Sequence, residues 1–528
     1  MHRFLLWAGL AGCACLALVP ARGDQKPSLG DALALQETME RAIREAEPSI
    51  ACILVSRSPV YQKWFGETPH PETPGRLGDF NPDRAALQAP PNERAQVDEL
   101  KKEIALKLKQ YSNSTAVELE IKKQFDLSNP AYVPESYGSG VVVEKSGLIL
   151  TNYHVVRDAK KVYVRLPGGQ GSYANIRAAD PRSDLAILEL LDTSLQPLPA
   201  IRLGDGGHVR KGQFVLTIAN PFAAGFRDGS PSASWGILSN LRRRAPAKPG
   251  LDEMEHARLS LHHFGTLLQT DARLNLGCSG GALIDLRGEL IGLTTTLAAV
   301  TGGETAGGFA VPLDDDFKRI VAVLEQGKEV DYGFLGVGFE RDIVRGDSVR
   351  LGRVLLNSAA SRAGLLPGDA ILEVNDFPVR ENDDLFLAVG KLLAGSEARL
   401  KVRSLNGRVR MVTVKLDKFY QPTDQIIASN QPAWVRGLRV DYTSVLVQRD
   451  PFLREIPRGV YVREVQPNSP ADEARLQEAV ITEVNGQPVH DPDEFYREAD
   501  KVEKTAALVL TVVNREGSGS RQVKLVTR

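Results

Sequence analysis

The apolar residues of this chain fall into many short runs that are separated by glycines and polar turns. Between residues 137 and 311 the runs are rich in β-branched residues and lie at 140–143, 148–150, 162–165, 185–188, 214–218 and 290–293. Short strands broken by turns at this spacing are typical of an all-β barrel or sandwich, and not of alternating strand and helix units. The pattern therefore predicts a mainly β domain, which ends in a helix over 313–326.

The segment before this domain has a different pattern. Residues 24–50 indicate a helix that ends near Pro48, and residues 50–55 indicate a strand. From residue 56 to about 136, proline-rich turns precede a charged segment with one apolar stripe at helical spacing. The stripe consists of Val97, Leu100, Ile104, Leu108 and Tyr111. We expect 56–136 to be a large helical insertion packed on its own domain; a regulatory or oligomer contact is the alternative.

The last third of the chain contains an internal repeat. The segment from Asn357 to Val379 recurs from Asn468 to Val489, including the motif Glu-Val-Asn before a turn and a Pro-Val pair. Two copies of this length indicate two small domains and not a solenoid, which needs more and shorter repeats. We place them at about 332–419 and 436–528, joined by a polar linker over 420–435.

Composition and charge exclude several classes of protein. The 528 residues predict three to four domains, and 42% hydrophobic with 25% charged residues is ordinary for globular chains. Lys and Arg number 65 and Asp and Glu 66, so the basic excess of a nucleic-acid binder is missing, and we expect no nucleic-acid partner. Four cysteines are too few for a disulfide scaffold.

The first residues match a secretory signal. A positive start at Met1–Arg3 precedes the apolar run Phe4–Val19, and small residues lead up to Gly23. We therefore expect 1–23 to be a cleaved signal peptide and the protein to be exported to the periplasm or cell envelope. Leu10–Cys13 also fits a lipobox, so lipidation at Cys13 and an uncleaved anchor are the alternatives.

The segment Gly277–Gly281, with the sequence Gly-Cys-Ser-Gly-Gly, is the first chemical signal. A serine between glycines can sit on a tight turn whose backbone N–H groups converge on an oxyanion. An α/β-hydrolase would place the acid and the histidine after the serine. Here the candidate partners, His154 and Asp184, precede Ser279. The order His, Asp, Ser on an all-β domain is the order of chymotrypsin-like proteases.

Several longer motifs make the sequence similar to the HtrA/Deg family of serine proteases. They lie at 138–141, 150–156, 183–188, 269–272, 277–283, 288–292 and 308–312. The resemblance implies a chymotrypsin-like double β-barrel protease domain over 24–328, followed by two PDZ-like α+β domains. It also implies an exported, ATP-independent serine endopeptidase without cofactor or metal, which degrades unfolded or misfolded envelope proteins and assembles as a trimer-based homo-oligomer.

The resemblance assigns a role to each candidate residue. Ser279 is the nucleophile, His154 its general base and acid, and Asp184 the group that orients the imidazole. The backbone amides of Gly277, Cys278 and Ser279 form the oxyanion hole. Two residues depart from the family pattern: Cys278 stands in place of the usual Asn, and Tyr153 in place of the usual Ala.

Specificity residues follow from the same resemblance. Leu274, Thr296 and Leu297 match the positions that line the primary pocket, which implies a shallow apolar pocket for small or medium aliphatic side chains. In the first repeat the loop Phe334, Leu335, Gly336 and Val337 matches a site for peptide C-termini. In the second repeat Arg439 replaces the glycine of this loop, so we expect a degenerate copy with a structural or assembly role.

Two other clusters carry less weight. His256, His262 and His263 lie in a polar insertion, where we expect solvated loop histidines and not a metal site. Arg242–Arg244 is interpreted as a solvated charge run.

Two alternative functions stay open: a non-hydrolytic PDZ holdase or scaffold with a misaligned triad, and a hydrolase that uses the Cys278 thiol.

Overall fold

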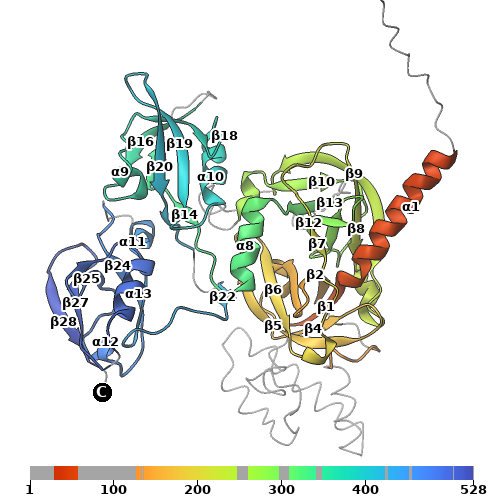
Figure 1. Ribbon diagram of the computed structural model, residues 1–528, viewed down its shortest axis with the longest axis horizontal. Helices are drawn as coiled ribbons and strands as arrows, with labels where there is room; N and C mark the ends of the chain where they lie inside the picture. The colour runs from red at the N-terminus through yellow and green to blue at the C-terminus, as the bar shows by residue number, and fades with distance from the viewer. Residues whose placement is uncertain are drawn as a thin grey trace, which may run out of the picture.

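The structure is a computed structural model (Figure 1), which describes residues 29–57, 126–131, 134, 136–245, 260–295, 308–339, 348–421, 426–450, 453, 455–503 and 505–526. The predicted signal peptide, most of the 56–136 insertion, His256, Thr296 and Leu297 lie outside these residues. No helix in the described ranges has both the length and the apolar character needed to cross a bilayer.

A long helix, α1 (Leu29–Ala46), begins the described chain and ends where Pro48 enters the short 3-10 turn η1 (Glu47–Ser49). Only its last turns are covered, because Ala42 and Ala46 pack into the core below. Figure 1 shows α1 in red, projecting from the rest of the fold. The predicted helix, from the first described residue onward, and the strand that follows it are both present.

Six antiparallel strands form the first barrel, in the order β5-β4-β1-β2-β3-β6, and the pairing of β5 with β6 closes it. The strands are β1 (Ile50–Ser56), β2 (Ser136–Glu144), β3 (Leu148–Asn152), β4 (Lys161–Arg165), β5 (Gly171–Asp180) and β6 (Leu185–Leu190). Their inward residues are the β-branched and leucine positions of the short runs seen in the sequence. A one-turn helix, α6 (Tyr153–Val156), follows β3.

The second barrel has the order β11-β8-β9-β10-β13-β12 and is closed by the pairing of β11 with β12. Its strands are β8 (Phe214–Ala219), β9 (Ser232–Arg243), β10 (Leu267–Thr270), β11 (Ala282–Ile284), β12 (Glu289–Thr295) and β13 (Gly308–Pro312), with β7 (Arg202–Leu203) parallel to β12. The predicted closing helix is α8 (Asp315–Glu325). One core joins both barrels and α8, so the expected double β-barrel is confirmed, and we call 29–326 the double barrel.

The repeat in the sequence corresponds to two units with the same topology. In the first C-terminal unit (333–418) the strand order is β15-β16-β17-β19-β20 with β18 beside β17, and in the second (435–526) it is β23-β24-β25-β27-β28 with β26 beside β25. Each unit has a core of its own. The elements of the first unit are β14 (Gly333–Phe334), β15 (Val337–Phe339), β16 (Val349–Val354), α9 (Ala359–Arg362), β17 (Ala370–Val374), β18 (Phe377–Pro378), α10 (Asn382–Gly390), β19 (Glu397–Arg403), β20 (Val409–Lys415) and β21 (Asp417–Lys418).

In its described part the second unit repeats the six strands of the first unit's larger sheet and has one helix more, but it has no strands that correspond to β14 and β21. Its elements are β23 (Leu438–Tyr442), α11 (Ser444–Arg449), β24 (Val460–Val465), α12 (Pro470–Glu473), β25 (Val480–Val484), β26 (Gln487–Pro488), α13 (Pro492–Asp500), β27 (Leu508–Val513) and β28 (Arg521–Leu525). Figure 1 shows the two units in cyan and blue, on the side of the double barrel that carries α8.

The segment 420–435 is not a free linker between the two units. It contains a two-residue strand, β22 (Ile427–Ala428), which pairs antiparallel with β5 and extends the sheet of the first barrel. Two backbone bonds continue the contact: Ser429 N–H donates to the carbonyl of Arg177, and Asn430 N–H donates to that of Gly327. The chain therefore returns to the double barrel before it enters the second unit.

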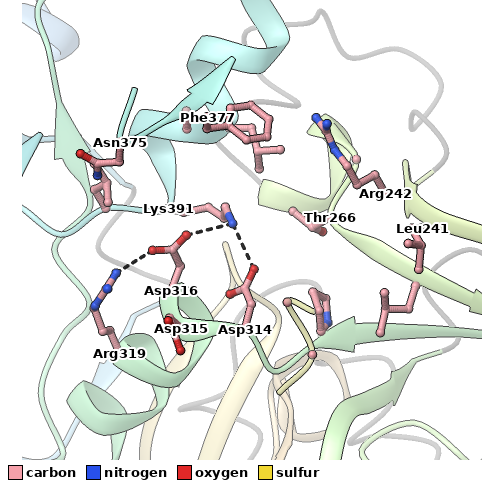
Figure 2. A pocket seen from close by; sticks show the side chains of 18 of the residues that line it. Leu241, Arg242, Thr266, Asp314, Asp315, Asp316, Arg319, Asn375, Phe377 and Lys391 are labelled. Atoms are coloured by element: carbon pink, nitrogen blue, oxygen red, sulfur yellow. Dashed lines mark hydrogen bonds and ion pairs between the residues drawn. The ribbon is translucent and has the colours of Figure 1, made fainter. Parts of the chain in front are cut away.

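Ion pairs connect the double barrel to the first C-terminal unit around a shared cavity (Figure 2). Lys391 Nζ lies 3.1 Å from a carboxylate oxygen of Asp314 and 2.9 Å from one of Asp316, at the start of α8. Burial opposes the charge, but the two carboxylates outweigh it and raise the pKa of Lys391.

The charge run at the end of β9 also takes part in this contact. Arg242 pairs with Asp384 at 3.2 Å, and Arg244 pairs with Asp383 at 2.5 Å and with Glu381 at 3.3 Å. The three acids stand at the N-terminus of α10. Arg242 and Arg244 are exposed, as expected of a solvated charge run, and in addition each pairs with acids that lie far away in the sequence.

Candidate active site

His154 and Asp184 meet where the first barrel faces the second. Asp184 occupies the turn between β5 and β6 with φ 56°, a left-handed conformation that aspartate tolerates better than most residues. Its Oδ2 lies 2.8 Å from His154 Nδ1, and its Oδ1 accepts the backbone N–H of His154 at 3.0 Å. Because an ionised carboxylate only accepts, this contact places the ring proton on Nδ1 and leaves Nε2 as the acceptor.

The helix that carries His154 is held at both ends. At its start, the Asp184 carbonyl accepts hydrogen bonds from Tyr153 N–H at 3.0 Å and from the Asn152 side-chain amide at 3.1 Å. At its end, the Arg57 guanidinium donates to the carbonyls of His154 and Val155, at 3.3 and 3.0 Å. The buried Tyr153 ring, which departs from the family pattern, therefore leaves the His154–Asp184 contact intact.

Ser279 lies on a tight turn just before β11, and the residue is buried. The turn is pinned by Gly280, whose N–H donates to the Thr294 carbonyl at 2.8 Å, and by the Ser279 carbonyl, which accepts Ser139 N–H at 2.8 Å. A Cβ at Gly138 would lie 2.6 Å from Val155 and 3.2 Å from the Ser279 carbonyl oxygen. The His154 helix and the Ser279 turn thus pack against the same glycine of β2, which brings the three predicted residues into one region.

The peptide bond before Gly277 has a fixed orientation. The Leu276 carbonyl accepts Phe222 N–H at 2.7 Å. Because C=O and N–H point to opposite sides of a trans peptide, the Gly277 N–H faces away from Phe222. The other side of Gly277 is fixed too: its carbonyl accepts the Ser139 hydroxyl at 2.8 Å, and that hydroxyl accepts Asn220 N–H. Gly277 has φ 92°, a value that favours glycine.

The amide of Cys278 is not available to an oxyanion. It donates to the Asn275 carbonyl at 3.0 Å within the same turn. The expected set of three backbone donors therefore reduces to Gly277 and Ser279.

The thiol of Cys278 also has a structural environment. The residue is buried, and its Sγ accepts Asn275 N–H at 3.3 Å. Burial raises the pKa of this thiol, which disfavours the thiolate that a cysteine nucleophile requires. This geometry argues against the cysteine hydrolase as an alternative.

The predicted specificity pocket is described only in part. Leu274 is half-buried and packs its side chain onto Gly308 of β13. Thr296 and Leu297 lie outside the described residues, so the shape of this pocket stays a prediction.

Sequence reasoning missed a positioning contact made by His262. Its ring is buried, stacks on Phe317 at 5.9 Å, and donates from Nε2 to the Ser183 carbonyl at 2.9 Å. Its Nδ1 accepts the Thr266 hydroxyl at 2.5 Å. The expectation of a solvated loop histidine is wrong for His262, which instead supports the residue before Asp184. The flanking apolar Leu261 and Phe264 were the only local signal.

The loop Phe334–Val337 forms one wall of a pocket in the first C-terminal unit. Gly336 has φ 79° and packs against Ser358, while the carbonyls of Leu335 and Gly336 accept backbone N–H groups at 2.9 Å. In the second unit Arg439 lies over the Trp434 ring at 4.0 Å and pairs with Glu464 at 3.1 Å. The two loops therefore differ in their surroundings as well as in sequence.

Comparisons with known proteins agree with this geometry. Residues 138–293 match the family described as trypsin-like peptidase domain. The chain is 30% identical over 425 residues, which cover 78% of it and 85% of the relative, to the periplasmic pH-dependent serine endoprotease DegQ of Escherichia coli. It is also 30% identical over 391 residues, covering 72% and 75%, to the periplasmic serine endoprotease DegP of Salmonella typhimurium. The chain belongs to the HtrA/Deg family of serine endoproteases.

Membership of the HtrA/Deg family confirms the resemblance in the sequence and supports a serine endopeptidase over a non-hydrolytic holdase or scaffold. Among solved structures, the HtrA-type protease AlgW with tripeptide is 23% identical and covers 73% of this chain and 98% of its own, with a TM-score of 0.44.

No group of three His, Cys, Asp or Glu side chains in the described ranges is arranged to hold a metal ion.

Proposed function

We propose that His154, Asp184 and Ser279 are the catalytic triad of this HtrA/Deg protease. The observation that carries the proposal is the double contact of Asp184 with the backbone N–H and the ring Nδ1 of His154. This contact fixes the tautomer in which Nε2 can accept a proton. The Ser279 turn supplies the nucleophile on the other side of Gly138.

The chemistry follows from these positions. Ser279 Oγ attacks the peptide carbonyl while His154 Nε2 takes its proton, and the Asp184 carboxylate stabilises the imidazolium that forms. The N–H groups of Gly277 and Ser279 stabilise the tetrahedral oxyanion. His154 then gives the proton to the leaving amine, and a water molecule activated by the same imidazole hydrolyses the acyl-enzyme.

The first C-terminal unit is proposed to bind peptide C-termini as a PDZ-like domain. In the described sheet β15 is an edge strand, and α10 lies across the pocket from it. A peptide can add to such an edge as a further strand, with its carboxylate received by the amides of Phe334–Val337. The second unit is proposed as a structural or assembly module, since Arg439 is engaged by Trp434 and Glu464.

The substrates are proposed to be unfolded or misfolded proteins of the cell envelope. The relatives are named periplasmic endoproteases, which supports export of this chain, and we propose that a signal over 1–23 is cleaved. We further propose a trimer-based oligomer and a shallow aliphatic pocket lined by Leu274, Thr296 and Leu297. Deletion of the 56–136 insertion tests its part in assembly, because a changed oligomer mass is expected if it forms contacts between copies.

The experiment that tests the triad is labelling of the mature protein with a fluorophosphonate, with and without an unfolded substrate. Ser279→Ala is expected to abolish labelling, and Cys278→Ala to retain it. Unfolded substrate is expected to increase labelling if peptide binding promotes activity. A folded protein that is not labelled under either condition would overturn the proposed triad.

A further inference from the structure

Arg182 is a buried cation at the contact between the double barrel and the first C-terminal unit. It stands in the turn between β5 and β6, two residues before Asp184, and is only 3% exposed. Its guanidinium carbon lies 4.7 Å from the centre of the Tyr332 ring and 4.2 Å from that of Phe419. Two aromatic faces therefore hold this side chain in place.

The guanidinium retains donors that nothing in the described chain accepts. Among the described residues, its Nε and Nη1 have no hydrogen-bond partner. The carboxylate of Asp180, whose charge acts on Arg182, already accepts the N–H and hydroxyl of Ser183 and the Tyr332 hydroxyl. Burial lowers the pKa of Arg182 to about 10, so the group is still charged at neutral pH. A buried charge with unpaired donors is costly unless an anion joins it.

The cation belongs to the wall of the pocket in the first C-terminal unit. Residues of the loop and of α10 line this pocket together with Arg182, among them Leu335, Gly336 and Val389. At the C-terminal end of α10, a Cβ on Gly390 would lie 2.9 Å from Arg182 Nη2. The close approach of the guanidinium thus depends on a glycine, and it brings a charge from the double barrel into an otherwise largely apolar pocket.

We propose that Arg182 is the cationic contact for the terminal carboxylate of a peptide bound along β15. The proposal rests on the proposed peptide binding by the first unit, and it adds a residue of the neighbouring double barrel to that site. The apolar walls formed by Leu335, Val337 and Val389 suit an aliphatic last residue. Peptide and protease domain then meet at the turn that also presents Asp184.

The test measures binding of a short fluorescent peptide that ends in valine, made once with a free carboxylate and once as the C-terminal amide. The full-length Ser279→Ala protein avoids cleavage of the peptide. We expect it to bind the carboxylate form at least about tenfold more tightly than the amide. Arg182→Met is expected to remove most of this preference while binding of the amide is unchanged, and Arg182→Lys to restore part of it.

A matched control is Arg408→Met, which removes the same charge from an exposed position of the same unit that does not line the pocket. This control should keep the full preference for the carboxylate. The unliganded Arg182→Met protein is expected to melt no earlier than its parent, because it loses an unpaired buried charge.

The outcomes separate the two proposals. If the parent protein does not prefer the carboxylate peptide, the proposed binding of C-termini fails, and the role of Arg182 fails with it. If the parent prefers the carboxylate and a folded Arg182→Met keeps that preference, only the role of Arg182 is overturned. If Arg182→Met does not fold, Arg182→Lys with an unaltered affinity for both peptides overturns it as well.

Discussion

The carbonyl of Leu276 accepts a hydrogen bond of 2.7 Å from the backbone N–H of Phe222. Phe222 and Ala223 both adopt left-handed conformations, with φ 52° and 55°, which are unusual for residues other than glycine. A strained loop therefore fixes the peptide group between Leu276 and Gly277. The carbonyl of this group bonds to Phe222, and its N–H is that of Gly277. The orientation of one proposed oxyanion donor depends on a loop more than fifty residues earlier in the chain.

Phe222→Pro removes this donor and cannot adopt φ 52°. We expect kcat to fall by about 10²–10³, the usual cost of losing one oxyanion donor, with a smaller change in KM. Phe222→Ala keeps the N–H and loses only an exposed ring, so its kcat should stay near that of the parent. Peptidase kinetics on proteins with matched thermal melts check both variants; a folded Phe222→Pro with full kcat would contradict the role of the hydrogen bond from Phe222 to Leu276.

Asp184→Asn keeps the size of the side chain but replaces an acceptor by a group that can also donate. The His154 ring then loses the bond that fixes its proton on Nδ1, and kcat should fall by about 10⁴. The measurement is steady-state hydrolysis of a peptide substrate, together with fluorophosphonate labelling. Asp192→Asn changes an exposed cap of a 3-10 turn that bonds to none of the three site residues in the described chain; it is the control and should keep full activity.

His262 is expected to make stability depend on pH. Burial lowers the pKa of this imidazole below its usual 6.5, and the charge of nearby Asp184 only partly opposes the effect. The unfolded chain therefore binds a proton at His262 more readily than the folded chain. The contribution of the neutral imidazole to stability is fully present above pH 6.5 and decreases as the pH falls below this value.

His262→Gln removes the titrating group while it retains an amide that can donate to the Ser183 carbonyl. Melting temperatures measured between about pH 5.5 and 7.5 should decrease less toward acid pH in this variant than in the parent. If the melting temperature depends on pH equally in the two proteins, the acid sensitivity comes from other groups.

Lys391 is expected to keep the first C-terminal unit against the start of α8. Lys391→Met leaves Asp314 without its cation and leaves Asp316 paired with Arg319 alone, and we expect this to weaken the contact by about 1–2 kcal/mol, between the values for exposed and buried pairs. Faster limited proteolysis between the double barrel and the unit, and a larger radius of gyration in solution scattering, are the readouts. The exposed Lys328→Met is the control; an unchanged digestion pattern in Lys391→Met would contradict this role.

Local patterns in the sequence were enough for the elements and for the main motifs. The short β-branched runs predicted a β domain because each strand places alternate residues in a barrel core, and the order of His154, Asp184 and Ser279 limited the chemistry to one class. Contacts between distant segments could not be predicted this way. His262 is buried by Phe317 and bonded to Ser183, and Arg244 is paired with Asp383; none of these partners is near in the sequence.

The two-residue strand β22 anchors the segment that enters the second C-terminal unit. Ile427–Ala428 is hydrogen-bonded to β5, and Ser429 and Asn430 are bonded to the double barrel. The second unit is also fixed to the first, because Lys418 pairs with Asp441 at 2.9 Å and Lys415 pairs with Asp491 at 2.7 Å. The double barrel and the two units therefore form a closed ring of contacts, and this ring includes β5, whose last residue pairs with Leu185 beside Asp184.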